Sequence, residues 1–153
     1  MTKEDVIRDL TKKLETRISV LKSALAETTE NAIGEETRSE GKYDTRAIEA
    51  SYLAEAQREQ LTLAEEALTR FQGFDFPAFD FDAEVASGAL VEVEQDGKIC
   101  FYLLAPTGGG LITEYLGCEV TVLSPESRLS DDLLGRKLGE AIPRPPLTIT
   151  GVE

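Results

Sequence analysis

Residues 89–105, ALVEVEQDGKICFYLLA, carry the clearest structural pattern in the C-terminal half of this chain. Residues 89–95 alternate between apolar and polar side chains, and residues 98–105 form a more continuously apolar run, so both segments are typical of β-strands. Between them, Asp96-Gly97 is a favoured pair for a two-residue hairpin turn. The stretch therefore predicts two antiparallel strands, the second of them buried in a core.

Further along the chain, residues 118–125 and 147–152 have the composition of two more strands. A short helix is predicted between them, from Ser130 as its N-cap to Leu134, with Gly135 as its C-cap. A small antiparallel sheet wrapped on one short helix is an α+β domain.

The N-terminal half carries two apolar stripes at helical spacing. Thr2 is a candidate N-cap for the first helix, with Asp5 completing a cap-like box, and Gly73 ends the second. Two long helices joined by a polar turn predict an antiparallel coiled-coil hairpin over residues 1–73, and a compact bundle against the C-terminal part is the alternative. The stripe residues are Ile7, Leu10, Leu14, Ile18, Leu21 and Leu25, then Ala50, Leu53, Gln57, Leu61, Ala64, Leu68 and Phe71.

Composition excludes several classes of function. The chain has 153 residues, a formal net charge of −13, two Cys and no His. Binding of duplex DNA through its phosphates needs Lys and Arg, and an anionic membrane surface attracts the same residues, so both partners are disfavoured. The absence of His removes His-dependent catalytic triads and His-ligated zinc sites. A basic surface or a cation is the expected partner.

The two cysteines and the missing apolar spans indicate a reducing cytoplasm. No apolar run approaches the length of a membrane helix, and the charged N-terminus has no signal-peptide core. Cys100 and Cys118 both fall in strand-like runs, so we expect buried free thiols rather than a disulfide.

A phenylalanine-rich linker is predicted over residues 74–82, FDFPAFDFD, ahead of the α+β domain at 83–153. Phe74, Phe76, Phe79 and Phe81 alternate with acidic residues, and Pro77 blocks a helix. One interpretation is that the rings dock the base of the hairpin onto the C-terminal domain. The other is an exposed apolar patch for a partner.

The turn between the two predicted helices is rich in acidic residues. Such a cluster is ordinarily a solvated turn, yet carboxylates at the end of a long arm could also enter another protein's site and hold Mg²⁺. The acidic residues of 27–49 are Glu27, Glu30, Glu35, Glu36, Glu40, Asp44 and Glu49, against Arg38, Lys42 and Arg46.

Residues 120–142, VTVLSPESRLSDDLLGRKLGEAI, resemble the C-terminal domain of the bacterial Gre-type (GreA/GreB) transcript-cleavage factors. The resemblance rests on three motifs: Ser124-Pro125 after a strand, Leu133-Leu134-Gly135-Arg136 after a short helix, and Gly139-Glu140 before the last strand. Residues 42–60, KYDTRAIEASYLAEAQREQ, resemble the second hairpin helix of that family, and the preceding hairpin resembles it in architecture.

This resemblance implies an FKBP-like C-terminal domain and a coiled-coil arm that enters the secondary channel of RNA polymerase core. Asp44, with Glu40 and Glu49, is then expected to help hold the polymerase's catalytic magnesium, so that the polymerase cleaves a backtracked transcript. The factor itself is no enzyme and has no cofactor of its own. Ser124, Pro125, Leu133 and Gly135 are the expected residues of the docking framework.

One departure from the family keeps alternatives open. The family pairs its tip Asp with a Glu three residues later, whereas the residue three after Asp44 is Ala47, and Glu49 lies five residues on. A factor that binds the same channel without stimulating cleavage, with an inhibitory or ppGpp-linked tip, is one alternative. A coiled-coil adaptor with no polymerase role is another.

Overall fold

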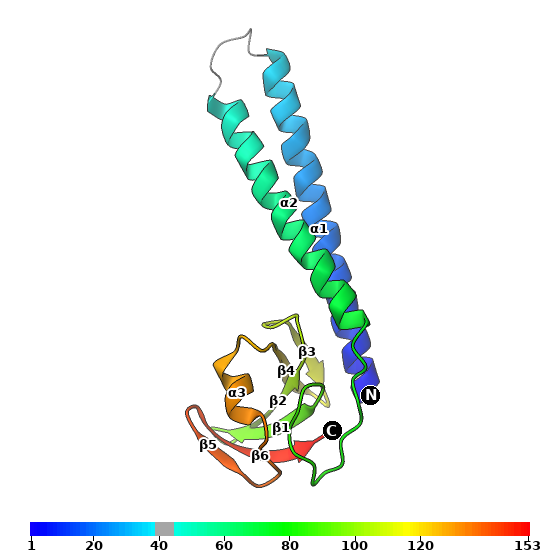
Figure 1. The fold of residues 1–153 in the computed structure, drawn as a ribbon, viewed down its shortest axis with the longest axis vertical. Coiled ribbons are helices and arrows are strands. Elements are labelled where there is room, and N and C mark those ends of the chain that lie inside the picture. Colours follow the sequence, from blue (N-terminus) through cyan, green and yellow to red (C-terminus); the bar gives the residue numbers. More distant parts are fainter. Residues whose placement is uncertain (39–44) are drawn as a thin grey trace. The chain divides into compact units, whose positions relative to one another are not determined.

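The computed structural model describes residues 1–38 and 45–153. They form two compact units, which we call the sheet unit, Met1–Lys13 with Ala67–Glu153, and the hairpin unit, Leu14–Glu66. Helices α1 (Lys3–Arg38) and α2 (Thr45–Gln72) contribute residues to both units and form the N-terminal helical hairpin (Figure 1). The predicted boundaries at residues 73 and 83 stay predictions.

The ends of the helices follow the local sequence. The backbone N–H of Thr2 donates to the Asp5 carboxylate (2.8 Å), and the Asp5 N–H donates to the Thr2 hydroxyl (3.3 Å), which is the reciprocal box expected at the start of α1. At the end of the second helix, α2 stops at Gln72, and the Gly73 N–H still donates to the Thr69 carbonyl (3.0 Å). Both predicted helix ends are confirmed.

The predicted stripes are shifted by one residue at two positions and are confirmed at five others, Leu10, Leu14, Ile18, Ala64 and Phe71. Val6 is buried in the sheet unit, where the prediction placed Ile7. In the hairpin unit, Leu53 is 52% exposed while Ala54 is only 4% exposed, so the predicted position of Leu53 is wrong. Alanines occupy the buried face of α2 at positions 47, 54 and 64, and only the last of these belonged to the predicted stripe.

The sheet of the sheet unit has six strands in the order β3-β4-β2-β1-β6-β5 (Figure 1). Its bounds are β1 (Leu90–Gln95), β2 (Lys98–Leu104), β3 (Ile112–Tyr115), β4 (Cys118–Leu123), β5 (Ala141–Pro143) and β6 (Pro146–Val152).

The sheet is mixed, whereas the sequence predicted an antiparallel one. Strands β2 and β4 are parallel neighbours, with Phe101 opposite Val120, and the other pairs are antiparallel. The missed strands β3 and β5 are only four and three residues long. Because β3 lies outside β4 and reverses the chain, β4 returns parallel to β2. The predicted α+β class, a helical hairpin followed by a sheet with one short helix, is confirmed.

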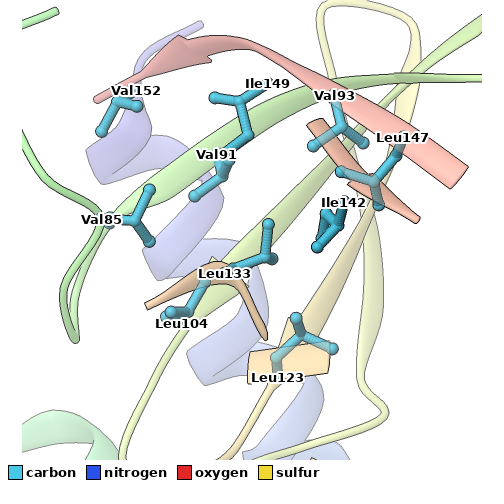
Figure 2. Packing of buried hydrophobic residues seen from close by; sticks show 11 residues of the cluster. Val85, Val91, Val93, Leu104, Leu123, Leu133, Ile142, Leu147, Ile149 and Val152 are labelled. Atoms are coloured by element: carbon cyan, nitrogen blue, oxygen red, sulfur yellow. The ribbon is translucent and has the colours of Figure 1, made fainter. Parts of the chain in front are cut away.

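One face of the sheet packs against α3 (Arg128–Leu133) and forms a core of aliphatic side chains, in which Leu133 is fully buried (Figure 2). Ser130 was predicted as the N-cap, but it is buried inside the helix, and Ser127 occupies the N-cap position. Gly135 has the left-handed backbone (φ +80°) that the predicted helix stop requires. The core residues are Val85, Ala89, Val91, Val93, Leu104, Leu123, Leu133, Ile142, Leu147, Ile149 and Val152.

Two-residue turns join two of the hairpins. Asp96 (φ 53°) and Gly97 (φ 74°) connect β1 to β2, as predicted. Leu116 (φ 53°) and Gly117 (φ 77°) connect β3 to β4 with nearly the same φ angles. Asp tolerates a positive φ far better than Leu does, so the second turn contains an unfavourable residue.

Candidate functional site

Of the three acidic residues predicted at the hairpin tip, only Glu49 is in a described part of the chain. Glu40 and Asp44 lie outside the described residues. Glu49 is exposed on α2. In the parts of the chain that the structure covers, residues 1–38 and 45–153, no three acidic or cysteine side chains come together in a way that could hold a metal ion.

Ala47 is the position at which the resemblance implies a second acid, and its side chain is buried in the hairpin unit, with 8% exposure. A carboxylate there would lose its hydration, which is costly without a partner. Glu49 follows two residues later, about 200° around the helix, and is exposed. The position that matches the family's second acid and the next acid along α2 therefore lie on opposite sides of the helix.

The expected docking residues fall into two groups in the sheet unit. Ser124 and Pro125 follow β4 at the surface, half-buried and exposed respectively. The Ser124 carbonyl accepts from the Ser127 N–H (2.9 Å), and the Ser124 hydroxyl is bonded to Glu126, which lowers the pKa of that carboxyl. Leu133, in contrast, is fully buried in the core, and Gly135 provides the turn after α3. Pro125 and Gly135 are thus exposed, Ser124 is half-buried, and only Leu133 is removed from the surface.

The glycine-rich loop that follows β2 lies against Ser124. A Cβ atom built on Gly109 would approach the Ser124 Cβ to 3.0 Å, so only glycine allows this close approach without movement. Gly108 and Gly110 flank it with positive φ angles of 82° and 91°. The three consecutive glycines were the sequence signal for this contact, but sequence alone does not say what the loop approaches.

Of the four phenylalanines in the linker, three are packed against other side chains and one is exposed. Phe74 and Phe76 pack edge to face, with ring centroids 4.8 Å apart, and Phe76 also contacts Phe71 at 5.1 Å. Phe79 packs against the aliphatic core, and the Lys3 ammonium lies 5.0 Å from its ring centroid. Phe81 alone among the four is largely exposed, at 72%. Three rings therefore dock within the sheet unit and one remains on its surface.

The exposed Phe81 belongs to an apolar pocket of about 240 Å³ that the sequence did not reveal. Leu116 and Leu138, both partly exposed, line it together with the buried rings of Phe101 and Tyr115. The Tyr115 hydroxyl donates to the Glu153 carboxylate (3.4 Å) at the same pocket. Leu116 has a positive φ angle, which is unfavourable for leucine, so the turn itself does not explain why a leucine is found there.

Lys3 ties the start of α1 to the end of the chain within the sheet unit. Its ammonium donates to the carbonyl oxygens of Pro77 (2.7 Å) and Glu153 (2.8 Å). Burial lowers the pKa of Lys3 from its ordinary value of 10.5 to about 8, although the negative charge of Glu153 acts in the opposite direction. This cation contributes hydrogen bonds to the fold and is poorly hydrated.

Both cysteines are free thiols, as predicted, but each is half-buried rather than buried. Burial raises the pKa of the Cys100 thiol, so little reactive thiolate forms at neutral pH. Across the described ranges, none of the helices is both long enough and apolar enough to cross a membrane.

No protein-family model matches this chain, and no curated protein matches it either. Among solved structures, the chain is similar to the GreA factor homologue Gfh1 of Thermus thermophilus, at 16% identity and a TM-score of 0.37 over 94% of each chain. It is also similar to Gfh1 of Thermus aquaticus, at 15% identity and a TM-score of 0.34, over 93% of this chain and 92% of the other.

Proposed function

We propose that this protein is a Gre-like transcription factor that binds RNA polymerase core through the secondary channel and promotes cleavage of backtracked transcripts. The observation that carries the proposal is the order of architectures, a helical hairpin followed by an α+β sheet, in the arrangement that the motifs of residues 120–142 imply. The buried face of α2 in the hairpin unit is alanine-lined, which suits a slender arm, because small side chains let two helices approach closely.

In this proposal the chemistry belongs to the polymerase. Asp44, with Glu40 and Glu49, contributes carboxylate oxygens near the polymerase's magnesium, the ligand type that this ion prefers. Such a ligand steadies the metal and its water for phosphodiester hydrolysis. The protein then acts in the cytoplasm, has no catalytic activity alone and makes no sequence-specific contact with DNA, in keeping with its charge of −13.

A second candidate, a regulator that enters the same channel without stimulating cleavage, is favoured by Ala47. The position that matches the family's second acid is a buried alanine, and the next acid along α2 lies on the opposite side of the helix. This candidate keeps the polymerase contact and changes only its consequence. It predicts competition with a cleavage factor for the same channel.

The test is a transcript-cleavage assay on a halted, backtracked elongation complex with Mg²⁺, together with a direct binding measurement on core polymerase. The cleavage proposal expects the wild type to accelerate release of the RNA 3′ fragment at least tenfold, and Asp44→Ala to abolish that gain while still binding. Glu66→Ala, which removes one exposed carboxylate from α2 far along the sequence from the tip, is the matched control and should behave as wild type.

Each other outcome selects a different function. Binding of the wild type without any acceleration supports the non-cleaving regulator. Absence of binding to core polymerase contradicts both candidates and leaves an adaptor role. An equal loss with Asp44→Ala and Glu66→Ala would show a general charge effect rather than a specific ligand.

A further inference from the structure

A second pocket in the sheet unit, which the proposed function does not use, is lined by three arginines. Its volume is about 340 Å³, within the range of small-molecule sites. Its lining comes from α3 and the residues just after it, and from β5 and the turn that follows β5. The residues that line it are Arg128, Asp132, Arg136, Ile142, Pro143 and Arg144.

Positive charge is concentrated at this pocket, although the part of the chain that contains it is strongly acidic. Residues 74–153 contain only five basic residues against fourteen acidic ones, and three of the five basic residues line this one cavity. Within residues 1–38 and 45–153, none of the three guanidinium groups forms an ion pair with a carboxylate. The lining therefore carries a net charge of about +2, with Asp132 as its one acid, in a strongly acidic protein.

The main chain of two of these arginines, Arg136 and Arg144, is held by hydrogen bonds or by strand pairing beside it. Arg136 is held by its own N–H, which donates to the Leu133 carbonyl (3.1 Å), and by its carbonyl, which accepts from the Val85 N–H (2.8 Å). Its Nε donates to the Asp132 carbonyl (3.2 Å), which uses one of its five N–H donors. Arg144 lies in the short turn between Pro143 and Pro146, the last pair of β5 and β6. The backbone of Arg136 and that of Arg144 are thus each held by the surrounding structure.

The arginines that line the pocket are suited to binding a phosphate group. A guanidinium presents paired N–H donors that match a phosphate oxygen pair, and several cations around one cavity balance an anion of charge −2 or more. Ile142, which is buried, and Pro143 add an apolar wall beside the arginines. We propose that this arginine pocket binds the phosphate groups of a small phosphorylated molecule, with the apolar part of that molecule against Ile142 and Pro143.

The experiment is isothermal titration calorimetry of the full chain with inorganic pyrophosphate, with ADP and with adenosine, at 50 and 150 mM salt. We expect saturable one-to-one binding of pyrophosphate and tighter binding of ADP, and no binding of adenosine, since the phosphates provide most of the attraction. Arg128→Gln and Arg144→Gln should each weaken binding about tenfold, the usual order for one charge-assisted contact. Lys98→Gln removes one positive charge of the same unit outside the pocket and should change the affinity less than twofold.

Three results would overturn this proposal. The first is no saturable heat with pyrophosphate or ADP at millimolar concentration and 50 mM salt. The second is an equal weakening by Lys98→Gln, which would indicate binding to the general surface charge. The third is arginine-dependent binding of a hexaglutamate peptide in place of pyrophosphate, which would identify an acidic protein segment as the occupant. Circular dichroism spectra of both arginine variants that match the wild type confirm that a loss of binding is not a loss of fold.

Discussion

The hairpin unit and the sheet unit bury apolar surface in opposite ways. In the sheet unit, valine, leucine and isoleucine side chains from five strands and α3 fill one core. Among the residues of the hairpin unit whose burial the structure describes, 14–31 and 47–66, the buried positions are Leu14, Ile18 and three alanines at 47, 54 and 64. Because free energy gained on burial scales with apolar area, the sheet unit gains much more per residue than the hairpin unit. The sheet unit is therefore expected to contribute most of the stability of the chain.

The difference also shows how each unit tolerates change. A packed aliphatic core loses stability when a side chain is shortened, because a cavity remains. An interface lined by alanine is sensitive in the other direction, because a larger side chain pushes the helices apart. Substitutions of opposite type in the two units therefore test the comparison.

The largest expected effect is the loss of a core side chain in the sheet unit. Leu133→Ala should lower the free energy of unfolding by about 2–5 kcal/mol, measured by urea denaturation followed by circular dichroism. Leu134→Ala, at the next residue, which is 44% exposed, is the matched control and should cost far less. Similar losses in both variants would contradict a core that depends on Leu133.

The second effect concerns the alanine-lined interface. Ala54→Leu should destabilise the hairpin unit by about 1–3 kcal/mol through overpacking. The measurement is hydrogen exchange, which should become faster for the amides of residues 14–31 and 47–66. Leu53→Ala, at an exposed neighbouring position, is the control and should change exchange little. If Leu53→Ala were the more damaging variant, the predicted burial of Leu53 would be right after all.

The third effect lies in the two hairpin turns of the sheet unit. Leu116→Asn should raise the unfolding free energy by about 1 kcal/mol, because Asn accepts a positive φ more readily than Leu does. Asp96→Asn, at the equivalent position of the other turn, should be close to neutral. A loss of stability on Leu116→Asn would show that the exposed leucine contributes packing that outweighs its strained backbone.

The smallest effect is a pH dependence from Lys3. Its pKa is lowered to about 8 in the folded state, so between pH 8 and 10.5 the unfolded chain binds more protons than the folded one. Stability of the wild type relative to Lys3→Met should therefore rise as the pH increases through that window. Thermal unfolding at pH 7, 8, 9 and 10 measures the difference, and a flat difference would contradict the desolvation of this ammonium.

Local sequence predicted much of the fold. The Thr2–Asp5 box, the end of α2 before Gly73, the Asp96-Gly97 turn and the left-handed Gly135 all depend on interactions within a few residues, and all are present. The short strands β3 and β5 were missed because three or four residues carry too little pattern to separate them from loops. For the candidate site, sequence named the tip acids and the Ser124-Pro125 turn, while the Phe81 pocket and the arginine pocket needed the folded chain.

By itself, the sequence determined the order of a helical hairpin and an α+β part, the helix ends and the strongly acidic charge. Only the folded chain shows that Ala54 rather than Leu53 is buried, that β4 lies parallel to β2, and that arginines 8 and 16 residues apart in sequence share one cavity. The two kinds of feature differ in how far apart along the chain the interacting residues are. Caps and turns are set by neighbouring residues, whereas burial, strand partners and converging charges depend on segments that meet only after folding.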